Sequence, residues 1–421
     1  MKNVEPKTLK GFRDFLPKET KKRQYAIDTL KKVFESYGFE PLETPALEYE
    51  EVLLGKYGEE GDKLMYRFVD NGGRRVALRY DQTVPLSRVV AQYSPRGGAG
   101  QNELSMPFKR YQIQPVWRAE NTQKGRFREF LQCDVDIVGT TSPLSDAEVI
   151  AVATNALKTL GFKDYKVLIN DRNNFSYFQE SMNLSQEQVM AVIRAIDKLK
   201  KIGRDGVINE LKEKGFSYDQ AATVIDSISN IKPTEYILEI MQNLKKMGIK
   251  EERIQFYPTL ARGLDYYTDL IFEIEIEGYT AGSVCGGGRY DKLIAMFSDK
   301  DIPAVGFAFG FDRLIEAMDA LKLFPDNLET TKVLVTIFSK ELKEKSIEIS
   351  SRLRSNNINT EIYLDENAKL EKQLKYADQK GIPYVVVIGP EEAEKNQITL
   401  KNMQTREQKT FNQEGLVKEL A

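Results

Sequence analysis

Apolar residues recur at helical spacing near the start of the chain and predict its first helix. Ile27, Leu30, Val33 and Phe34 fall on one face, because positions three and four apart are neighbours on a helix surface. Gly38 follows this pattern, and glycine is the residue that most often ends a helix. We therefore expect a helix that packs one face on a core and stops before Gly38.

The next part of the chain alternates short apolar segments with turn residues. Pro41 and Pro45 exclude a long helix there. Two pairs of extended segments, each joined by a short polar turn, have the pattern of antiparallel hairpins. They are residues 66–69 with 76–80 and residues 109–120 with 126–137. The first half of the chain is therefore expected to be rich in antiparallel sheet.

A later stretch, which ends near residue 244, has the pattern of charged amphipathic helices. Ser185 with Gln188 and Ser217 with Gln220 have the spacing of capping boxes, in which each side chain of the pair bonds the other residue's backbone. Strand patterns then resume. These helices are therefore expected to form an insertion in a sheet-rich domain.

A separate unit is predicted after Asp326. Its apolar strand patterns alternate with helical ones, and this alternation favours a parallel or mixed sheet. The expected strands are 333–338, 360–364 and 384–388. The sequence thus predicts an α+β protein with an antiparallel sheet core and a helical insertion, followed by a smaller α/β unit with a mixed sheet.

The composition removes several kinds of chemistry. The chain of 421 residues has 61 Lys and Arg and no His, so neither a Ser-His-Asp system nor a zinc site with imidazole ligands can form. Cys133 and Cys285 are too few for a disulfide framework or an all-thiolate metal site, and they favour the cytoplasm. The net charge of -2 argues against a globally basic nucleic-acid binder. No apolar run approaches the roughly 20 residues of a membrane span.

The longer hairpin carries the densest polar row. Strand periodicity places Leu131, Cys133, Val135, Ile137 and Phe127 on one face, and Phe130, Arg126, Arg128, Gln132, Asp134 and Asp136 on the other. A half-solvated sheet is the usual explanation of such alternation. Arg118 and Glu120 on the first strand have matching parity, however, and so many guanidiniums and carboxylates could hold an anion and an amine together. Phosphates and amino acids both fit.

Three later segments are ambiguous when each is taken alone. Residues 260–268 contain Arg262 and two adjacent tyrosines, which could supply aromatic walls and hydroxyl donors or simply form a sheet edge. The run Gly286–Gly288 before Tyr290 could form a pocket floor, although a glycine run is more often a turn. Arg313 is expected near the start of a helix, where an arginine is usually a surface charge.

Together these segments resemble, in order and spacing, the three signature motifs of class II aminoacyl-tRNA synthetases, and specifically the histidyl-tRNA synthetase family. The matching segments are KGFRDFLP at 10–17, LRYDQTVP at 78–85, QCDVD at 132–136 and RGLDYYT at 262–268. The last two are the most specific. The resemblance covers essentially the whole chain. It implies a class II catalytic domain at 1–325 with a helical insertion at about 172–245, and an anticodon-binding domain at 328–421.

The resemblance also implies roles for individual residues. Arg118 and Arg262 are the expected catalytic residues, one on each side of the ATP α-phosphate. The nucleotide is expected to contact Arg118, Glu120, Arg126 and Arg313. The α-ammonium group of histidine is expected at Asp81, Thr83 and Gln132, its imidazole at Asp136 and Tyr267, and the pocket around it at Tyr266, Tyr290 and the Gly286–Gly288 run.

The partners implied by the resemblance are ATP, which carries Mg²⁺, together with histidine and tRNA(His); no separate metal site and no membrane contact are expected. Gln123 in the hairpin loop is the expected contact to the tRNA acceptor end. Asn121 and Thr122 in that loop replace the Arg and Pro usual in bacterial members, and so the flanks look more like the archaeal and eukaryotic branch. The first class II motif around Pro45 implies a homodimer.

The activity implied is the activation of histidine with ATP to histidyl-adenylate and its transfer to the 3′ end of tRNA(His), with release of AMP and pyrophosphate. Two alternatives keep the same fold. One is a regulatory subunit of ATP phosphoribosyltransferase, a type that typically lacks the C-terminal domain and the Arg262 motif. The other is a module that senses uncharged tRNA and tolerates loss of ATP-binding arginines. Arg118, Arg262 and Arg313 are all present here, which favours the enzyme.

Overall fold

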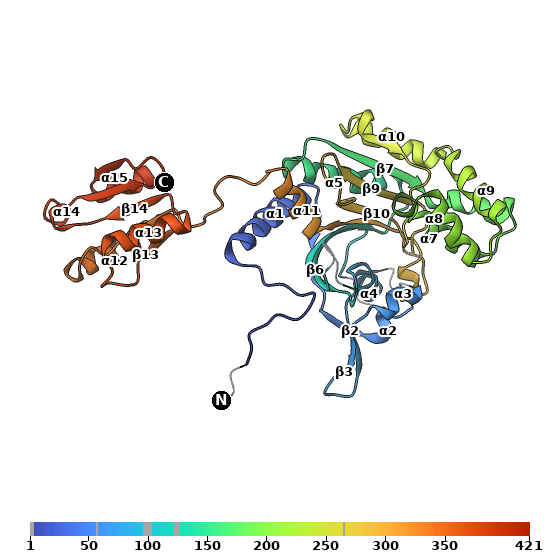
Figure 1. The fold of residues 1–421 in the computed structure, drawn as a ribbon, viewed down its shortest axis with the longest axis horizontal. Coiled ribbons are helices and arrows are strands. Elements are labelled where there is room, and N and C mark those ends of the chain that lie inside the picture. Colours follow the sequence, from blue (N-terminus) through green and yellow to red (C-terminus); the bar gives the residue numbers. More distant parts are fainter. Residues whose placement is uncertain (1–3, 56–57, 96–102, 122–126, 264–265) are drawn as a thin grey trace. The chain divides into compact units, whose positions relative to one another are not determined.

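The computed structural model describes residues 4–55, 58–95, 103–121, 127–263 and 266–421. The chain divides into two compact units, Met1–Phe324 and Pro325–Ala421 (Figure 1). Each unit has its own hydrophobic core. Within the described ranges, no helix is both long enough and apolar enough to cross a membrane.

A large sheet organises the first unit. Its strands follow the order β1-β5-β6-β11-β10-β9-β7-β8, and all neighbours are antiparallel except the outer pairs β1–β5 and β7–β8. The predicted hairpin is the antiparallel pair β5–β6. The strands are β1 Glu40–Pro41, β5 Phe108–Trp117, β6 Glu129–Val138, β7 Tyr165–Asp171, β8 Ile254–Phe256, β9 Leu270–Ile276, β10 Cys285–Arg289 and β11 Ala304–Gly310.

Helices pack on one face of this sheet, and two further apolar clusters cover parts of its polar face and leave the rest of that face open. They are α1 Pro17–Ser36, α5 Pro143–Thr159, α10 Glu235–Lys246 and α11 Phe311–Ala320 (Figure 1). Helix α1 buries Leu30 and Phe34, as its apolar period predicted, and it ends just before Gly38, which has a positive φ. These side chains share one core with Cys133, Val135 and Ile137 of β6. The predicted apolar face of β6 is therefore confirmed for these three residues.

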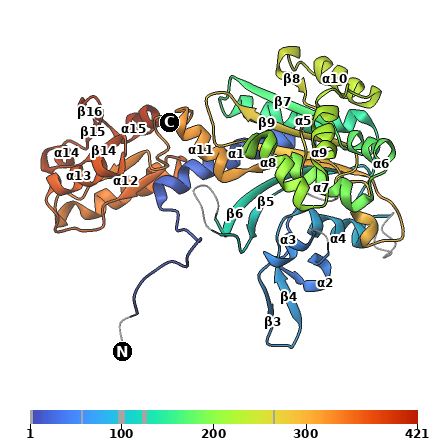
Figure 2. The same ribbon diagram turned by 45° about the vertical axis from the view of Figure 1, so that its right-hand side comes forward.

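A second group of helices has a core of its own. It comprises η1 Arg172–Phe175, α6 Tyr177–Ser181, α7 Gln186–Ile196, α8 Leu199–Glu213 and α9 Tyr218–Ser229. Helices α7, α8 and α9 lie side by side (Figures 1 and 2) and bury Val192, Leu211 and Val224 together. Both predicted capping boxes are formed, at the starts of α7 and α9. Helix α10 instead buries Ile237 and Ile240 in the core of the large sheet.

A small sheet in the order β2-β4-β3 completes the first unit. It contains the shorter predicted hairpin, in which β3 and β4 pair antiparallel. It packs against short helices over a further apolar cluster. These elements are β2 Leu47–Tyr49, β3 Arg67–Val69, β4 Arg75–Leu78, α2 Glu50–Leu53, α3 Gly58–Lys63, α4 Thr83–Tyr93 and η3 Ile294–Met296, whereas η2 Glu251–Arg253 precedes β8 of the large sheet.

The second unit contains a mixed sheet in the order β13-β12-β14-β15-β16. The three predicted strands are its parallel part, whereas β15 and β16 form an antiparallel hairpin that the sequence did not predict. Its elements are β12 Val333–Val335, η4 Lys340–Leu342, α12 Lys343–Ser355, β13 Thr360–Ile362, α13 Leu370–Lys380, β14 Tyr384–Val387, α14 Pro390–Glu394, β15 Ile398–Asn402, β16 Gln408–Phe411 and α15 Gln413–Leu420.

Candidate active site

The open face of the large sheet forms the floor of a cavity of about 470 Å³ in the first unit, a size typical of small-molecule sites. Gln132, Asp134 and Asp136 alternate along β6 and line this cavity. Their exposed fractions are only 7%, 2% and 3%. The polar row of the hairpin is therefore not a solvated sheet face. Buried polar groups at this density need partners, and partners in a cavity can come from a ligand.

Small residues on the neighbouring strands leave space for the side chains of Asp134 and Asp136. On β11, Gly306 pairs with Asp136 and Ala308 pairs with Asp134. A Cβ atom on Gly306 would lie 1.9 Å from Asp136 Oδ1, and one on Gly286 would lie 1.8 Å from Arg262 Nη1. A side chain at either position would therefore displace the Asp136 carboxylate or the Arg262 guanidinium from its place in the site.

One end of the floor is built around Asp136. Its Oδ1 accepts a short hydrogen bond from the Tyr290 hydroxyl, and its Oδ2 lies 2.7 Å from Arg110 Nη2 in an ion pair without hydrogen-bond alignment. Burial raises the pKa of Asp136, while Arg110 opposes that rise. Tyr266 stands beside this pair, with ring centroids 5.0 Å from Tyr267 and 5.9 Å from Tyr290. The result is an aromatic pocket with a carboxylate at its base.

The segment before α4 closes another side of the cavity. Asp81 and Thr83 line it, and Asp81 Oδ1 accepts a hydrogen bond of 3.1 Å from the Val84 N–H at the start of the helix. Gln82 Nε2 donates to the carbonyls of Gln114 and Gln132, at 2.7 and 3.2 Å. The start of α4 is thereby tied to β5 and β6.

Arginines also line the cavity, beside carboxylates such as Glu120. Arg118 follows β5 directly, and its guanidinium lies 4.3 Å from the ring centroid of Tyr80 and 5.1 Å from that of Phe130. Its Nε donates to the Tyr80 carbonyl at 3.1 Å. Arg313 lies in the first turn of α11 and donates to the Ser283 carbonyl at 3.3 Å. These contacts hold two cationic groups toward the cavity, where they can bind an anion.

The Arg262 guanidinium lies against Gly286 of β10. Its Nη1 donates to Glu273 Oε1 at 3.0 Å, and its carbonyl accepts from Arg172 Nη1 at 3.0 Å. Asp197, at the end of α7, also lines the cavity. Burial raises the pKa of Asp197 to about 6, and Arg262 opposes this rise. The helical group therefore supplies a carboxylate to the surroundings of Arg262.

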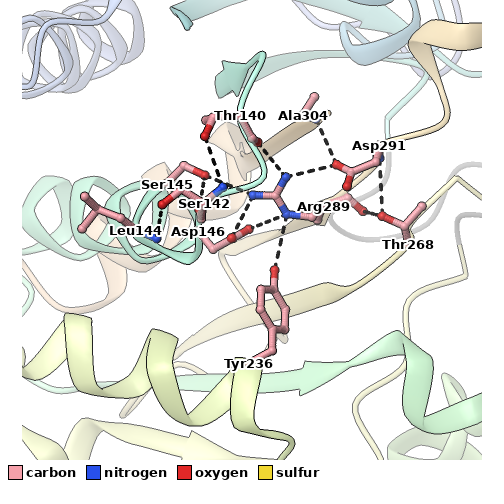
Figure 3. Close-up of polar contacts among 10 residues, drawn as sticks. All are labelled: Thr140, Ser142, Leu144, Ser145, Asp146, Tyr236, Thr268, Arg289, Asp291 and Ala304. Carbon is pink, nitrogen blue, oxygen red and sulfur yellow. Dashed lines mark hydrogen bonds and ion pairs between the residues drawn. The ribbon is translucent and has the colours of Figure 1, made fainter. Parts of the chain in front are cut away.

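Arg289, adjacent to Tyr290, is the centre of a buried polar network (Figure 3). Its Nε and Nη2 donate to both oxygens of Asp146, at 3.0 and 2.8 Å. Further bonds reach Tyr236 on α10 at 3.3 Å and Asp291 at 3.1 Å. The Arg289 carbonyl accepts from the Thr268 N–H at 2.9 Å. This network fixes the backbone that carries Tyr290 and the end of the Tyr266–Thr268 segment.

Comparison with known proteins decides the family. The sequence-family model described as "Histidyl-tRNA synthetase" matches residues 11–314 of this chain. This range is well over half of the chain. The chain belongs to the histidyl-tRNA synthetase family. A "Histidine--tRNA ligase" of Cytophaga hutchinsonii is 38% identical, with 96% of this chain and 97% of that protein covered. One from Gloeobacter violaceus is 40% identical, with 95% of both chains covered.

The fold prediction is confirmed by the same comparisons. The crystal structure of a histidyl-tRNA synthetase from a Nostoc species superposes with a TM-score of 0.84 at 32% identity, and 99% of each chain is covered. The model described as "Anticodon binding domain" matches residues 332–421. Both parts of the predicted architecture, the sheet core with its helices and the smaller unit with a mixed sheet, thus have counterparts among histidyl-tRNA synthetases.

The cavity brings together the predicted site residues that fall in the described part of the chain. Lining it are Arg118, Glu120, Arg262, Arg313, Asp81, Thr83, Gln132, Asp136, Tyr266, Tyr267 and Tyr290. Gln123 and Arg126 lie outside the described residues. The placement of Phe127 on the apolar face was wrong: it lines the cavity, because β6 begins only at Glu129 and the strand alternation does not extend back to position 127.

Sequence reasoning missed four groups that the fold brings to the site. Asp134 lay on the predicted polar row, but no function was predicted for it. Arg110 has the same parity on β5, and this could have revealed it. Glu273 lies in an alternating strand that is typical of a solvated face, and Asp197 has no local signal at all. Their contribution depends on contacts between distant segments.

Proposed function

We propose that this chain is a histidine–tRNA ligase that activates histidine with ATP and transfers it from histidyl-adenylate to tRNA(His). The observation that carries this proposal is the arrangement of one cavity, which combines a buried carboxylate among phenols with a set of arginines. Asp136 and Gln132 are four residues apart on β6, which is about 13 Å at the usual strand rise. They pair with Gly306 and Gly310 of β11, respectively. Arg313, which we propose contacts the nucleotide, follows Gly310 by three residues, and the Gln132 end is therefore the proposed nucleotide side.

Asp136 has the chemistry to recognise imidazole. An ionised carboxylate accepts a hydrogen bond from an imidazole N–H, and Tyr267 can engage the second ring nitrogen. The contacts from Tyr290 and Arg110 hold Asp136 in place and favour its ionised form. A side chain that cannot pair with this buried group leaves it unsatisfied, and a site of that kind can discriminate by ~10⁴ or more.

The arginines suit the first chemical step, attack of the histidine carboxylate on the α-phosphorus of ATP. Arg118 and Arg262 would stabilise the charge that develops on the α-phosphate, with pyrophosphate as the leaving group. Arg313 would stack on adenine, and Glu120 and Arg126 would contact the nucleotide. The described residues include no group of three or more carboxylates or thiolates suited to hold a metal. We therefore propose that Mg²⁺ enters with the triphosphate.

In the second step a terminal ribose hydroxyl of tRNA attacks the adenylate carbonyl, and AMP leaves. The hydroxyl proton needs an acceptor, and the chain has no imidazole to provide one. We propose that a phosphate oxygen of the adenylate accepts it. Single-turnover transfer from preformed adenylate tests this step: neutralising Glu120 or Glu273 should leave the transfer rate within a few-fold. A collapse of transfer alone would refute it.

The remaining assignments concern the partners. We propose that residues 1–325 are the catalytic domain, with the helical insertion at about 172–245, and that residues 328–421 bind the tRNA anticodon. Gln123 is proposed to contact the acceptor end, and the segment around Pro45 to form a homodimer interface. The reducing cytoplasm is the proposed location, because the two thiols at 133 and 285 are both buried and unbridged.

Histidine-dependent exchange of pyrophosphate into ATP tests the proposed function directly. The wild-type chain should catalyse exchange with histidine and not with other amino acids. Asp136→Asn keeps the size of the side chain but removes the acceptor charge, so histidine-dependent exchange should fall by at least 10²-fold. Glu129→Gln, on the same strand but bonded to Trp117 at 2.6 Å, is the matched control and should exchange normally. Absence of exchange by a folded wild-type chain would overturn the proposal.

A further inference from the structure

Asp134 has an oxygen without a partner at the floor of the cavity. Its Oδ2 accepts a hydrogen bond of 2.9 Å from Gln132 Nε2. Its Oδ1 is buried and accepts no hydrogen bond from any described residue. The neighbouring amide cannot supply one, because Gln112 Nε2 already donates to Thr44 and Gln114 at 2.8 and 2.7 Å. A buried oxygen of this kind is costly unless a ligand satisfies it.

The charges around Asp134 point to a cationic ligand. Arg110 lies 2.7 Å from Asp136 but 4.0 Å from Asp134, so its single positive charge is directed mainly at Asp136. The titratable groups that influence Asp134 from the surrounding elements are Arg110 on β5, Asp136 on β6, Asp81 before α4, and Tyr267, Cys133, Cys285 and Arg79. With all three ionised, Asp81, Asp134 and Asp136 would together carry more negative charge than Arg110 can balance, and a bound cation would offset that excess.

The position of Asp134 on β6 indicates which part of the substrate it meets. It lies between Asp136, which the proposed function gives to the imidazole, and Gln132, to which it is already bonded. On β11 it faces Ala308, whose small side chain leaves the space above it open. The α-ammonium group of histidine is the cation that would lie between those two positions.

We propose that Asp134 is a further substrate-binding residue, which receives the α-ammonium group of histidine together with Asp81 and Gln132. This inference rests on the proposed function, since it concerns the same amino-acid site. It makes Asp134 a selector for amino acids over other imidazole compounds, because a ligand without the ammonium group leaves Oδ1 unpaired.

Binding of the ammonium group would also release a proton. Burial raises the pKa of Asp134 to about 8, Arg110 opposes this rise, and Asp136 and Asp81 reinforce it. The carboxyl is therefore mostly protonated at pH 7.5 in the empty site. An ammonium group beside it stabilises the carboxylate and lowers the pKa, so the proton passes to the buffer as histidine binds. In the range below pH 8, histidine should bind less tightly as the pH falls.

Calorimetric titration of the full chain tests the inference with two ligands, histidine and its analogue without the α-amino group, 3-(4-imidazolyl)propionate. At pH 7.5, in phosphate and in Tris, the difference in measured heat gives the protons released. Wild type should release a substantial fraction of a proton with histidine and almost none with the analogue. Asp134→Asn should weaken histidine binding at least tenfold, leave the analogue within about twofold, and abolish the proton release. Glu129→Gln is the control and should match wild type.

The alternatives give different results. Equal weakening of both ligands by Asp134→Asn would mean a structural role or an imidazole contact, and would overturn the inference. Unchanged histidine binding by the variant would overturn it as well. If the variant fails to fold, the wild-type comparison decides: equal proton release with both ligands contradicts the role of Asp134. Pyrophosphate exchange distinguishes a failure of this inference from a failure of the proposed function. If the wild-type chain exchanges with histidine, the proposed function stands even if Asp134 does not bind the ammonium group.

Discussion

Replacing Arg289 by methionine should destabilise the first unit far more than an ordinary single substitution. Arg289 is 2% exposed, and its ion-pair partner Asp146 is fully buried. Methionine has nearly the same length but no donor. The Arg289→Met variant would therefore leave the Asp146 carboxylate buried without its cation, and it would also remove the donor bonded to the Thr140 carbonyl at 3.0 Å.

The expected loss of stability follows from removing the cation that is paired with Asp146. Removing one partner of a buried ion pair costs about 3–5 kcal/mol, because the remaining charge has lost its compensation. Domains are typically stable by about 5–15 kcal/mol, so the loss is a large fraction of the total. A second substitution, Asp146→Asn, removes the orphaned charge. The double variant should therefore recover part of the stability that Arg289→Met loses.

The loss should depend on pH in a definite direction. Burial already raises the pKa of Asp146 from 3.8 to about 6, against the opposing effect of Arg289. Without Arg289 the folded-state pKa rises further, while the unfolded value stays the same. The folded variant then binds more protons than the unfolded chain, so its stability falls as the pH rises. The difference from wild type should be larger at pH 8 than at pH 5.5.

Urea unfolding followed by tryptophan fluorescence measures this effect in the relevant unit, because the chain has one tryptophan and Trp117 lies on β5. The denaturation midpoint of Arg289→Met should fall strongly at pH 8 and less at pH 5.5, and the double variant should show little of this dependence. A loss under about 1 kcal/mol, or a loss independent of pH, would refute the reasoning that a buried uncompensated carboxylate causes the effect.

Three further substitutions separate the site from the scaffold. Gly306→Ala places a Cβ atom against Asp136, so the KM for histidine should rise at least tenfold with the KM for ATP nearly unchanged; equal changes in both would contradict this. Gly286→Ala displaces the Arg262 guanidinium, and the exchange rate at saturating substrates should fall about 10²-fold while the thermal unfolding midpoint moves little. Ser217→Ala removes the cap of α9 and should lower the free energy of unfolding by about 1 kcal/mol in a denaturant titration, with normal exchange activity.

The elements that were predictable from sequence are those whose signals are local. The first helix followed from apolar spacing and Gly38, and the capping boxes at Ser185 and Ser217 are complete within four residues. Strand parity on β6 was equally informative, because alternation alone put Gln132, Asp134 and Asp136 on one face. Parity failed at position 127, where the chain has not yet entered the strand.

The parts that were not predictable depend on contacts between distant segments. In the sequence, Arg289 is distinguished only by its position next to Tyr290. Its buried ion pair is with Asp146, which is 143 positions away in sequence. Glu273 occupies an alternating strand that would suit a solvent-facing side chain, and only the fold brings Arg262 to within 3.0 Å of it. Neither residue has a local pattern that distinguishes it from an ordinary charged position.

The distribution of charge in the cavity explains how a histidine molecule would be oriented. Asp134 and Asp136 lie on the floor, and Arg118, Arg262 and Arg313 line the cavity together with further carboxylates such as Glu120 and Glu273. An amino acid has a cationic group and an anionic group on the same carbon, and the proposed contacts would place the ammonium group toward Asp134 and the carboxylate toward the arginines. That orientation would direct the attacking carboxylate to the proposed nucleotide side. Because the chain has no histidine, no imidazole of its own can compete for Asp136, and the imidazole in that pocket would be the substrate's.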